Sequence, residues 1–386
     1  MSELWWDLSV WFGLALLSSI VSLRLGISAV LAELIVGMIA GNLFHLSISD
    51  WVNLLANFGA VVITFLAGAE LESSAIKSFW KDSFAIGFMG FFPPFLGTGL
   101  LAYFFLGWNV KQSVLAGTIL SSISIAIVYA VLMEANLNEK PLGKLLLAAS
   151  FINGLGTLLV LTLLFVKIDR TFWIFLFVTL ILLVTLPSFT KRYFGYVNNH
   201  PSEPEVKYVL LVLVFLGFLA SQAGSVAVFP AYLVGVSLAN LFAENRELAK
   251  RMRMSAIALL TPFYFLKAGS LVDIKMVLTS LGLVFLFFFV RFSLKLMGLY
   301  PVGVFLRLPG RLNLFLTMMM STGLTFDTVA ALYGLDHGLI NKWQYSLLES
   351  VVLLSAVIPT LMAQRFFFPR FEDASLKRKE EVKRNV

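Results

Sequence analysis

Apolar residues along this chain occur in long runs, separated by short stretches that are rich in charged residues, Asn, Pro and Gly. A run of about 20 apolar residues is long enough for one helix to cross the hydrocarbon core of a bilayer. The pattern therefore predicts an all-α polytopic membrane protein with about 13 transmembrane helices. The expected segments are residues 8–23, 27–44, 52–69, 83–106, 112–133, 142–166, 171–189, 207–222, 226–243, 254–270, 276–300, 311–334 and 343–366.

Two of these segments have polar residues at their centres. Residues 121–124 read Ser-Ser-Ile-Ser, and residues 321–328 carry several hydroxyls together with Gly323 and Asp327. Irregular backbone is tolerated at membrane depth only where it faces protein or a water-filled cavity, and an ionisable group there marks a functional site. We therefore expect two discontinuous helices with Asp327 buried between them. The alternative is that Asp327 lies near a membrane surface and contacts water.

The chain also contains an internal repeat. Residues 29–44 match residues 227–242 at 7 of 16 positions, with an offset of 198. Phe65-Leu66-Ala67-Gly68 is echoed near Phe265, and residues 121–122 align with residues 321–322, at offsets close to 200. The two copies begin seven segments apart, so they run in opposite directions through the membrane. Inverted repeats of about 27–166 and 226–366 are expected, with the two discontinuous helices crossing near the midplane.

Composition and charge support a membrane location. Hydrophobic residues make up 59% of the chain and charged residues 13%, with a mean hydropathy of +0.90. A soluble domain has about 25% charged residues, so we expect one membrane domain over residues 1–366 and a short charged tail over residues 367–386. Positive residues number 21 on one side of the expected topology and 5 on the other. This asymmetry predicts a multi-pass cell-membrane protein with its N-terminus outside and its C-terminus in the cytoplasm. The net charge of +7 is thereby explained without nucleic-acid binding.

Several segments together resemble the monovalent cation:proton antiporter superfamily, in its bacterial and archaeal Na+/H+ and K+/H+ exchanger branch. The resemblance covers nearly all of residues 5–366 and implies a fold of thirteen transmembrane helices, a homodimer, and exchange of Na+ or K+ for protons. The segments that carry it are Glu33–Gly37, Phe65–Glu70, Pro141–Lys144, Leu155–Thr157, Lys267–Gly269, Ser321–Phe326 and Ala356–Thr360.

One position departs from the family pattern. The family places an acid in its sixth segment, which binds the cation and carries the proton, whereas this chain has Asn153 followed by Gly154. Glycine has no side chain that could do either. Another acid therefore replaces it, or the protein is a transport-impaired or uncoupled member of the same fold, whether by nature or by engineering.

Asp327 is the expected replacement acid. Na+ and K+ are held by carboxylate, hydroxyl and carbonyl oxygens, and unwound helices supply such groups in transporters. Expected charge partners are Lys295, Arg291 and Glu33; Arg291 is expected to pair with Asp327 or Glu349, and Lys295 alternatively reaches water at the inner end of its helix. The expected cation and proton site comprises Asp327, Asn153, Gly154, Ser122, Ser124, Thr322 and Thr325.

A different class of transporter remains open at this point. Arg291 and Lys295 would face the substrate in a symporter of an organic anion, a function found on similar inverted-repeat folds. An enzyme is not expected, because the chain has no metal-ligand spacing, no nucleophile motif and no phosphate-binding loop, and no cofactor is expected either. The expected partners are a monovalent cation, the proton, the lipid bilayer and a second copy of the chain.

Overall fold

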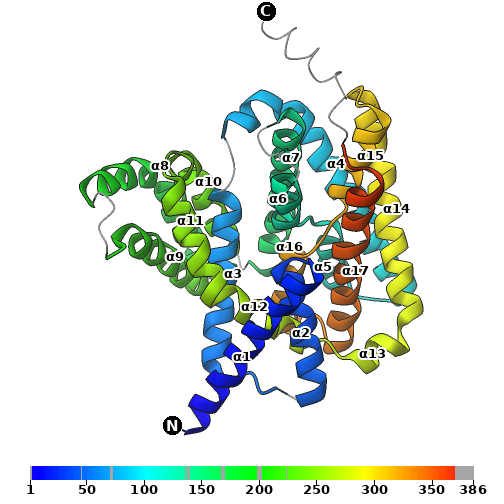
Figure 1. Ribbon diagram of the computed structural model, residues 1–386, viewed down its shortest axis with the longest axis horizontal. Coiled ribbons are helices and arrows are strands. Elements are labelled where there is room, and N and C mark those ends of the chain that lie inside the picture. The colour runs from blue at the N-terminus through cyan, green and yellow to red at the C-terminus, as the bar shows by residue number, and fades with distance from the viewer. Residues whose placement is uncertain are drawn as a thin grey trace, which may run out of the picture. The chain divides into compact units, whose positions relative to one another are not determined.

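The computed structural model describes residues 2–44, 46–69, 73–134, 137, 140–166, 170–197, 202–223 and 225–369. These residues form helices and no strand, which confirms the all-α class. The helices are α1 (Ser2–Leu25), α2 (Ala29–Phe44), α3 (Asp50–Ala69), α4 (Ser73–Leu106), α5 (Val110–Ser121), α6 (Ile125–Glu134), α7 (Pro141–Phe165), α8 (Arg170–Val197), α9 (Pro204–Gln222), α10 (Val228–Glu244), α11 (Arg246–Ser255), the π-helical turn η1 (Ala256–Leu260), α12 (Thr261–Ser270), α13 (Ile274–Thr279), α14 (Leu281–Phe305), α15 (Gly310–Met319), α16 (Thr325–Asp336) and α17 (Lys342–Phe366) (Figure 1).

Each expected apolar segment coincides with one of these helices or with a successive pair of them. Nine spans in the described part of the chain are long and apolar enough to cross a membrane, and α2 and α10 are shorter apolar helices. The number of thirteen crossings stays a prediction. The predicted tail lies outside the described residues, apart from residues 367–369.

The chain divides into two compact units. Unit 1 comprises Met1–Ser73, Leu158–Ser280 and Leu332–Leu347, and unit 2 comprises Ser74–Thr157, Leu281–Ala331 and Leu348–Val386. Both units combine segments from the two halves of the sequence, so neither corresponds to a single copy of the repeat. Helices α7, α16 and α17 each contribute residues to both units.

Unit 1 is built around two close helix pairs, α2 with α12 and α3 with α10. Glycine makes the close approach possible in both pairs. A Cβ atom on Gly37 of α2 would collide with the backbone of Leu266 on α12, and a Cβ atom on Gly235 of α10 would collide with the backbone oxygen of Phe65 on α3. Small residues at such positions let helix backbones pack directly against each other.

The two helix pairs correspond at their glycine contacts. Gly37 maps onto Gly235 at an offset of 198, and Phe65 maps onto Leu266 at an offset of 201. The same two offsets relate a second set of contacts, in which Gly68 faces the backbone of Tyr232 and Gly269 faces that of Leu34. These are the sequence segments in which the repeat was recognised, so the repeated glycines are explained by repeated backbone contacts.

Candidate functional site

The two discontinuous helices meet inside unit 2. Regular helical structure stops after Ser121 and resumes at Ile125 in the α5–α6 pair, and it stops after Met319 and resumes at Thr325 in the α15–α16 pair. The Ser124 backbone N–H donates to the Thr322 carbonyl at 3.0 Å, and the Ser124 and Thr325 hydroxyls are 3.1 Å apart. Backbone groups freed by one break thus find partners in the other, and the predicted crossing is confirmed.

Lys295 of α14 lies where two helices end. Its Nζ donates to the carbonyl oxygens of Ser121 at 2.8 Å, Ser122 at 3.0 Å and Met320 at 3.1 Å. The first two carbonyls belong to the C-terminal end of α5 and the third to that of α15, where unpaired carbonyls carry partial negative charge. Lys295 therefore neutralises two converging helix ends.

The alternative in which Lys295 reaches water is wrong. The side chain is 0% exposed. The three carbonyls explain its burial, because they satisfy the ammonium group inside the protein and remove the need for solvent.

Arg291, one turn away on α14, pairs with Asp327. Arg291 Nη2 lies 3.0 Å from Asp327 Oδ2, and it also donates to the Ser122 carbonyl at 3.2 Å. The two side chains are 1% and 0% exposed, so the alternative that Asp327 contacts water is wrong. Asp327 occupies the first turn of α16, where free backbone N–H groups stabilise a negative charge.

Gly323 gives this ion pair its space. A Cβ atom at this position would collide with Asp327 Oδ2 and with Arg291 Nη2. The glycine in the broken stretch therefore has a packing role in addition to interrupting the helix.

Three buried oxygens at the crossing have no hydrogen-bond partner among the described residues. They are Asp327 Oδ1, Ser122 Oγ and Asn153 Oδ1. Arg291 Nε and Nη1 are also buried without a partner there. The hydroxyl of Thr322, in contrast, donates to the Met319 carbonyl at 2.8 Å. Free oxygens around unwound helices are the groups with which transporters hold alkali cations and protons.

The position at which the family resemblance predicts an acid is buried in α7. Gly154 follows Asn153, whose Nδ2 donates to the Ser121 carbonyl at 3.3 Å. The same carbonyl accepts from Lys295, so Asn153 and Lys295 meet at one oxygen. The structure therefore brings Asn153, Ser122, Ser124, Thr322, Thr325 and Asp327 into one network with both basic residues, and it offers no side chain at Gly154.

Glu33 is placed differently from the other expected residues. It lies on α2 in unit 1, whereas the crossing belongs to unit 2. Its side chain is 2% exposed, and its Oε2 has no hydrogen-bond partner in the described part of the protein.

Glu349 of α17 was expected only as an alternative partner for Arg291. Instead its Oε1 accepts a hydrogen bond from the Thr328 hydroxyl at 2.6 Å, and the side chain is 0% exposed. Thr328 was noted from the sequence only as one of the hydroxyls of residues 321–328, and it was not included among the expected site residues. The available signal was a lone carboxylate within the apolar run at residues 343–366, on a helix whose neighbours the sequence does not reveal.

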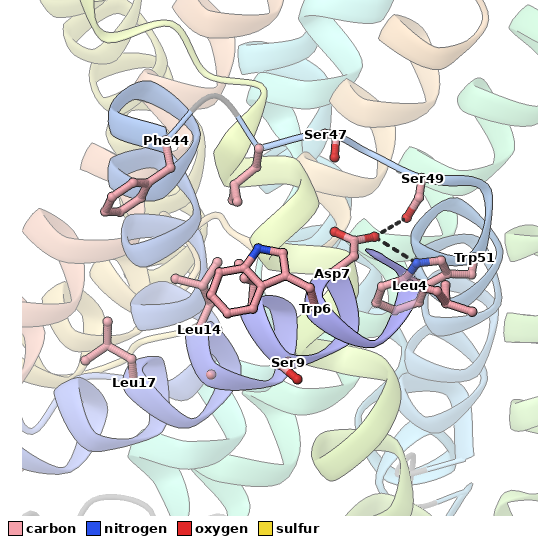
Figure 2. Close-up of a pocket in the computed structure, with 13 residues that line it drawn as sticks. Leu4, Trp6, Asp7, Ser9, Leu14, Leu17, Phe44, Ser47, Ser49 and Trp51 are labelled. Atoms are coloured by element: carbon pink, nitrogen blue, oxygen red, sulfur yellow. Dashed lines mark hydrogen bonds between the residues drawn. The ribbon is translucent and has the colours of Figure 1, made fainter. Parts of the chain in front are cut away.

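A separate pocket of about 930 Å³ opens in unit 1 beside the start of α1. Figure 2 shows Asp7 in this pocket pointing toward Ser49 and Trp51, whose Oγ and Nε1 donate to its Oδ2 at 2.8 and 2.9 Å. The other lining residues are mostly apolar, among them Trp6 and Leu14. None of the residues at the helix crossing lines the pocket. We place the candidate site at the crossing, because the buried ion pair and the free oxygens lie there.

Known proteins with similar sequences are transporters. A protein of Methanocaldococcus jannaschii named probable Na(+)/H(+) antiporter 3 is 25% identical over 358 residues, which cover 89% of this chain and 92% of that protein. The Na(+)/H(+) antiporter of Enterococcus hirae is 24% identical over 371 residues, which cover 91% and 94% of the two chains.

The fold has also been seen in a solved structure. The sodium proton antiporter MjNhaP1 of Methanocaldococcus jannaschii superimposes with a TM-score of 0.69 at 15% identity, covering 95% of this chain and 100% of that one. The transmembrane sodium/hydrogen exchanger family matches residues 12–368. This chain therefore belongs to the sodium/hydrogen exchanger family.

Proposed function

We propose that this protein exchanges a monovalent cation, Na+ or K+, for protons across the cell membrane. The observation that carries the proposal is the buried crossing in unit 2, where two discontinuous helices surround an ion pair and several free oxygens. Secondary transporters place their coupling-ion sites at such broken helices. Relatives across nearly the full length are named as Na(+)/H(+) antiporters, which supports the same assignment.

Within this proposal the residues of the crossing have distinct roles. Asp327 Oδ1, Ser122 Oγ and Asn153 Oδ1 provide oxygens along the path of the cation. Lys295 and Arg291 balance the charge of the helix ends and of Asp327. Gly154 carries no side chain beside Asn153. Three further hydroxyl residues, Ser124, Thr322 and Thr325, hold the two breaks together.

The proposal includes the arrangement of the protein in the membrane. Inverted repeats of about 27–166 and 226–366 are supported by the corresponding glycine contacts in unit 1. The N-terminus outside and the C-terminus in the cytoplasm are supported by the asymmetry of positive residues. A homodimer is proposed from the family resemblance.

The test is cation-driven proton movement in liposomes that contain the purified protein. A pH gradient is imposed, Na+ or K+ is added outside, and the internal pH is followed with a trapped dye. We expect internal pH to change only in protein-containing liposomes and only with the transported cation. An absence of response to Na+, K+, Li+ and Rb+ would contradict exchange, and a response that follows an organic anion would favour the symporter.

A further inference from the structure

Four ionisable side chains are buried in the described part of unit 2, two basic and two acidic. Arg291 and Asp327 form an ion pair, and Lys295 is satisfied by three carbonyls. Glu349 is the fourth. It has no ion-pair partner in this set: its Oε1 accepts from Thr328, and its Oε2 has no hydrogen-bond partner among the described residues.

A carboxylate in this setting is unstable as a free charge. Glu349 is 0% exposed and has one side-chain hydrogen bond within the described part of the protein, whereas an ionised carboxylate needs a cation or several donors when it is removed from water. The group must therefore be protonated or have a cation beside it, and these are the two states that an exchanger alternates between.

Asp327 is less suited to this alternation. The Arg291 guanidinium lies 3.0 Å from its Oδ2 and compensates its charge, so Asp327 has no free charge that a cation and a proton could neutralise in turn. Protonation of Asp327 would in turn leave Arg291 buried without its counter-ion. Asp327 therefore serves as the fixed counter-ion of Arg291, and it holds Arg291 and the start of α16 in place.

Glu349 is connected to the crossing through one residue. Thr328 follows Asp327 by one position on α16, and its hydroxyl reaches Glu349 on α17 at 2.6 Å. On α7, Asn153 and Gly154 offer no carboxyl group to the crossing. The carboxyl group of Glu349 on α17 therefore lies next to the second half of the interrupted α15–α16 pair.

We propose that Glu349 is the carboxyl group that binds the exchanged proton, an inference that rests on the proposed cation/proton exchange. When a cation arrives, the O–H bond of protonated Glu349 breaks, the proton leaves to water, and the cation occupies the space beside Oε2. On the other side of the membrane the cation leaves and a proton bonds to the same oxygen. One positive charge replaces another at each step, so the net charge of the buried set is constant and exchange is one-for-one and electroneutral.

The test compares Glu349→Gln, which retains shape and an acceptor for Thr328, with Glu349→Asp, which retains a carboxyl group. Glu247→Gln removes an exposed carboxyl group in unit 1 and serves as the control. Protons released into weakly buffered detergent solution are measured when Na+ or K+ is added, and exchange is measured in liposomes.

Wild type, Glu247→Gln and Glu349→Asp are expected to release protons and to exchange. Glu349→Gln is expected to release none and to lose at least about ten-fold in exchange rate, as for loss of an essential acid–base group. Exchange by the wild type should not respond to an imposed membrane potential. Proton release by Glu349→Gln equal to that of the wild type would overturn the role of Glu349 and leave the proposed exchange intact.

Infrared difference spectra recorded across pH test proton binding at Glu349 separately from the proposed cation/proton exchange. A carbonyl band of a protonated carboxyl group that is present in the wild type and absent in Glu349→Gln supports proton binding at Glu349, even if no cation drives transport. Identical spectra for the two proteins would overturn it.

A second variant decides the question if Glu349→Gln does not fold. Thr328→Val removes the hydrogen bond to Glu349 Oε1. If Glu349 binds the exchanged proton, the pH of half-maximal exchange should then shift, and an unchanged pH profile contradicts the inference.

Discussion

Arg291 Nη2 lies 3.0 Å from Asp327 Oδ2, with the two side chains 1% and 0% exposed. The pair joins α14 to the first turn of α16, next to the point where the α15–α16 pair is interrupted. Because both charges are removed from water, neither residue can be changed alone without leaving the other uncompensated. The ion pair also engages Oδ2 of Asp327, the residue that the sequence predicts to be the cation ligand.

Asp327→Asn should destabilise the protein. The substitution keeps the shape of the side chain but leaves the Arg291 guanidinium buried without a counter-ion, which costs about 3–5 kcal/mol for pairs of this kind. The thermal midpoint in detergent should fall, and Arg291→Met in the same protein should recover part of the loss. A single variant with wild-type stability would mean that Asp327 does not neutralise Arg291.

Gly323→Ala should also disrupt the ion pair. The added Cβ atom would collide with Asp327 Oδ2 and Arg291 Nη2, so the two side chains must separate or the backbone must shift, at a cost of about 1–3 kcal/mol. Gly282→Ala on α14 is the matched control, since a Cβ atom there meets nothing within 4 Å. Equal thermal midpoints for the two variants would show that the space around Gly323 is not restricted.

The repeated helix contacts in unit 1 predict equivalent effects at equivalent glycines. Gly37→Ala and Gly235→Ala each place a methyl group against the backbone of a neighbouring helix, and both should lower the thermal midpoint by similar amounts. Gly217→Ala has open space around its Cβ atom and should have no such effect. A large loss at one glycine and none at the other would contradict the structural correspondence of the two copies.

Gly154→Asp should increase pH-dependent cation exchange. It adds a titratable carboxylate next to Asn153, whose amide shares the Ser121 carbonyl with Lys295, so Lys295 becomes available as a partner. Exchange rates in liposomes over a range of pH provide the measurement, with Gly154→Ala as the control for added volume. Loss of exchange in Gly154→Asp but not in Gly154→Ala would show that a second acid in this region is harmful.

The sequence by itself determined the class of fold and the positions of its irregularities. Apolar runs of membrane-spanning length predicted the long helices, because a chain in lipid must satisfy its backbone within helices. The hydroxyls at residues 121–124 and 321–328 predicted both interruptions for the same reason. Helices that extend into polar sequence were predicted less well: α11 was not expected, and α4 and α8 reach beyond their apolar segments to Ser73 and Val197. Hydrophobicity does not mark the ends of such helices.

Only the tertiary structure decided which charges meet. The sequence offered Asp327 and Glu349 as alternative partners for Arg291, and it allowed Lys295 to reach water. In the folded protein Arg291 pairs with Asp327, and Lys295 is buried on the carbonyls of Ser121, Ser122 and Met320. These choices depend on how α14, α16 and α17 are turned and spaced relative to the two breaks, because a carbonyl or a carboxylate can bind a cation only within hydrogen-bond distance. Periodicity and composition carry no information about those distances.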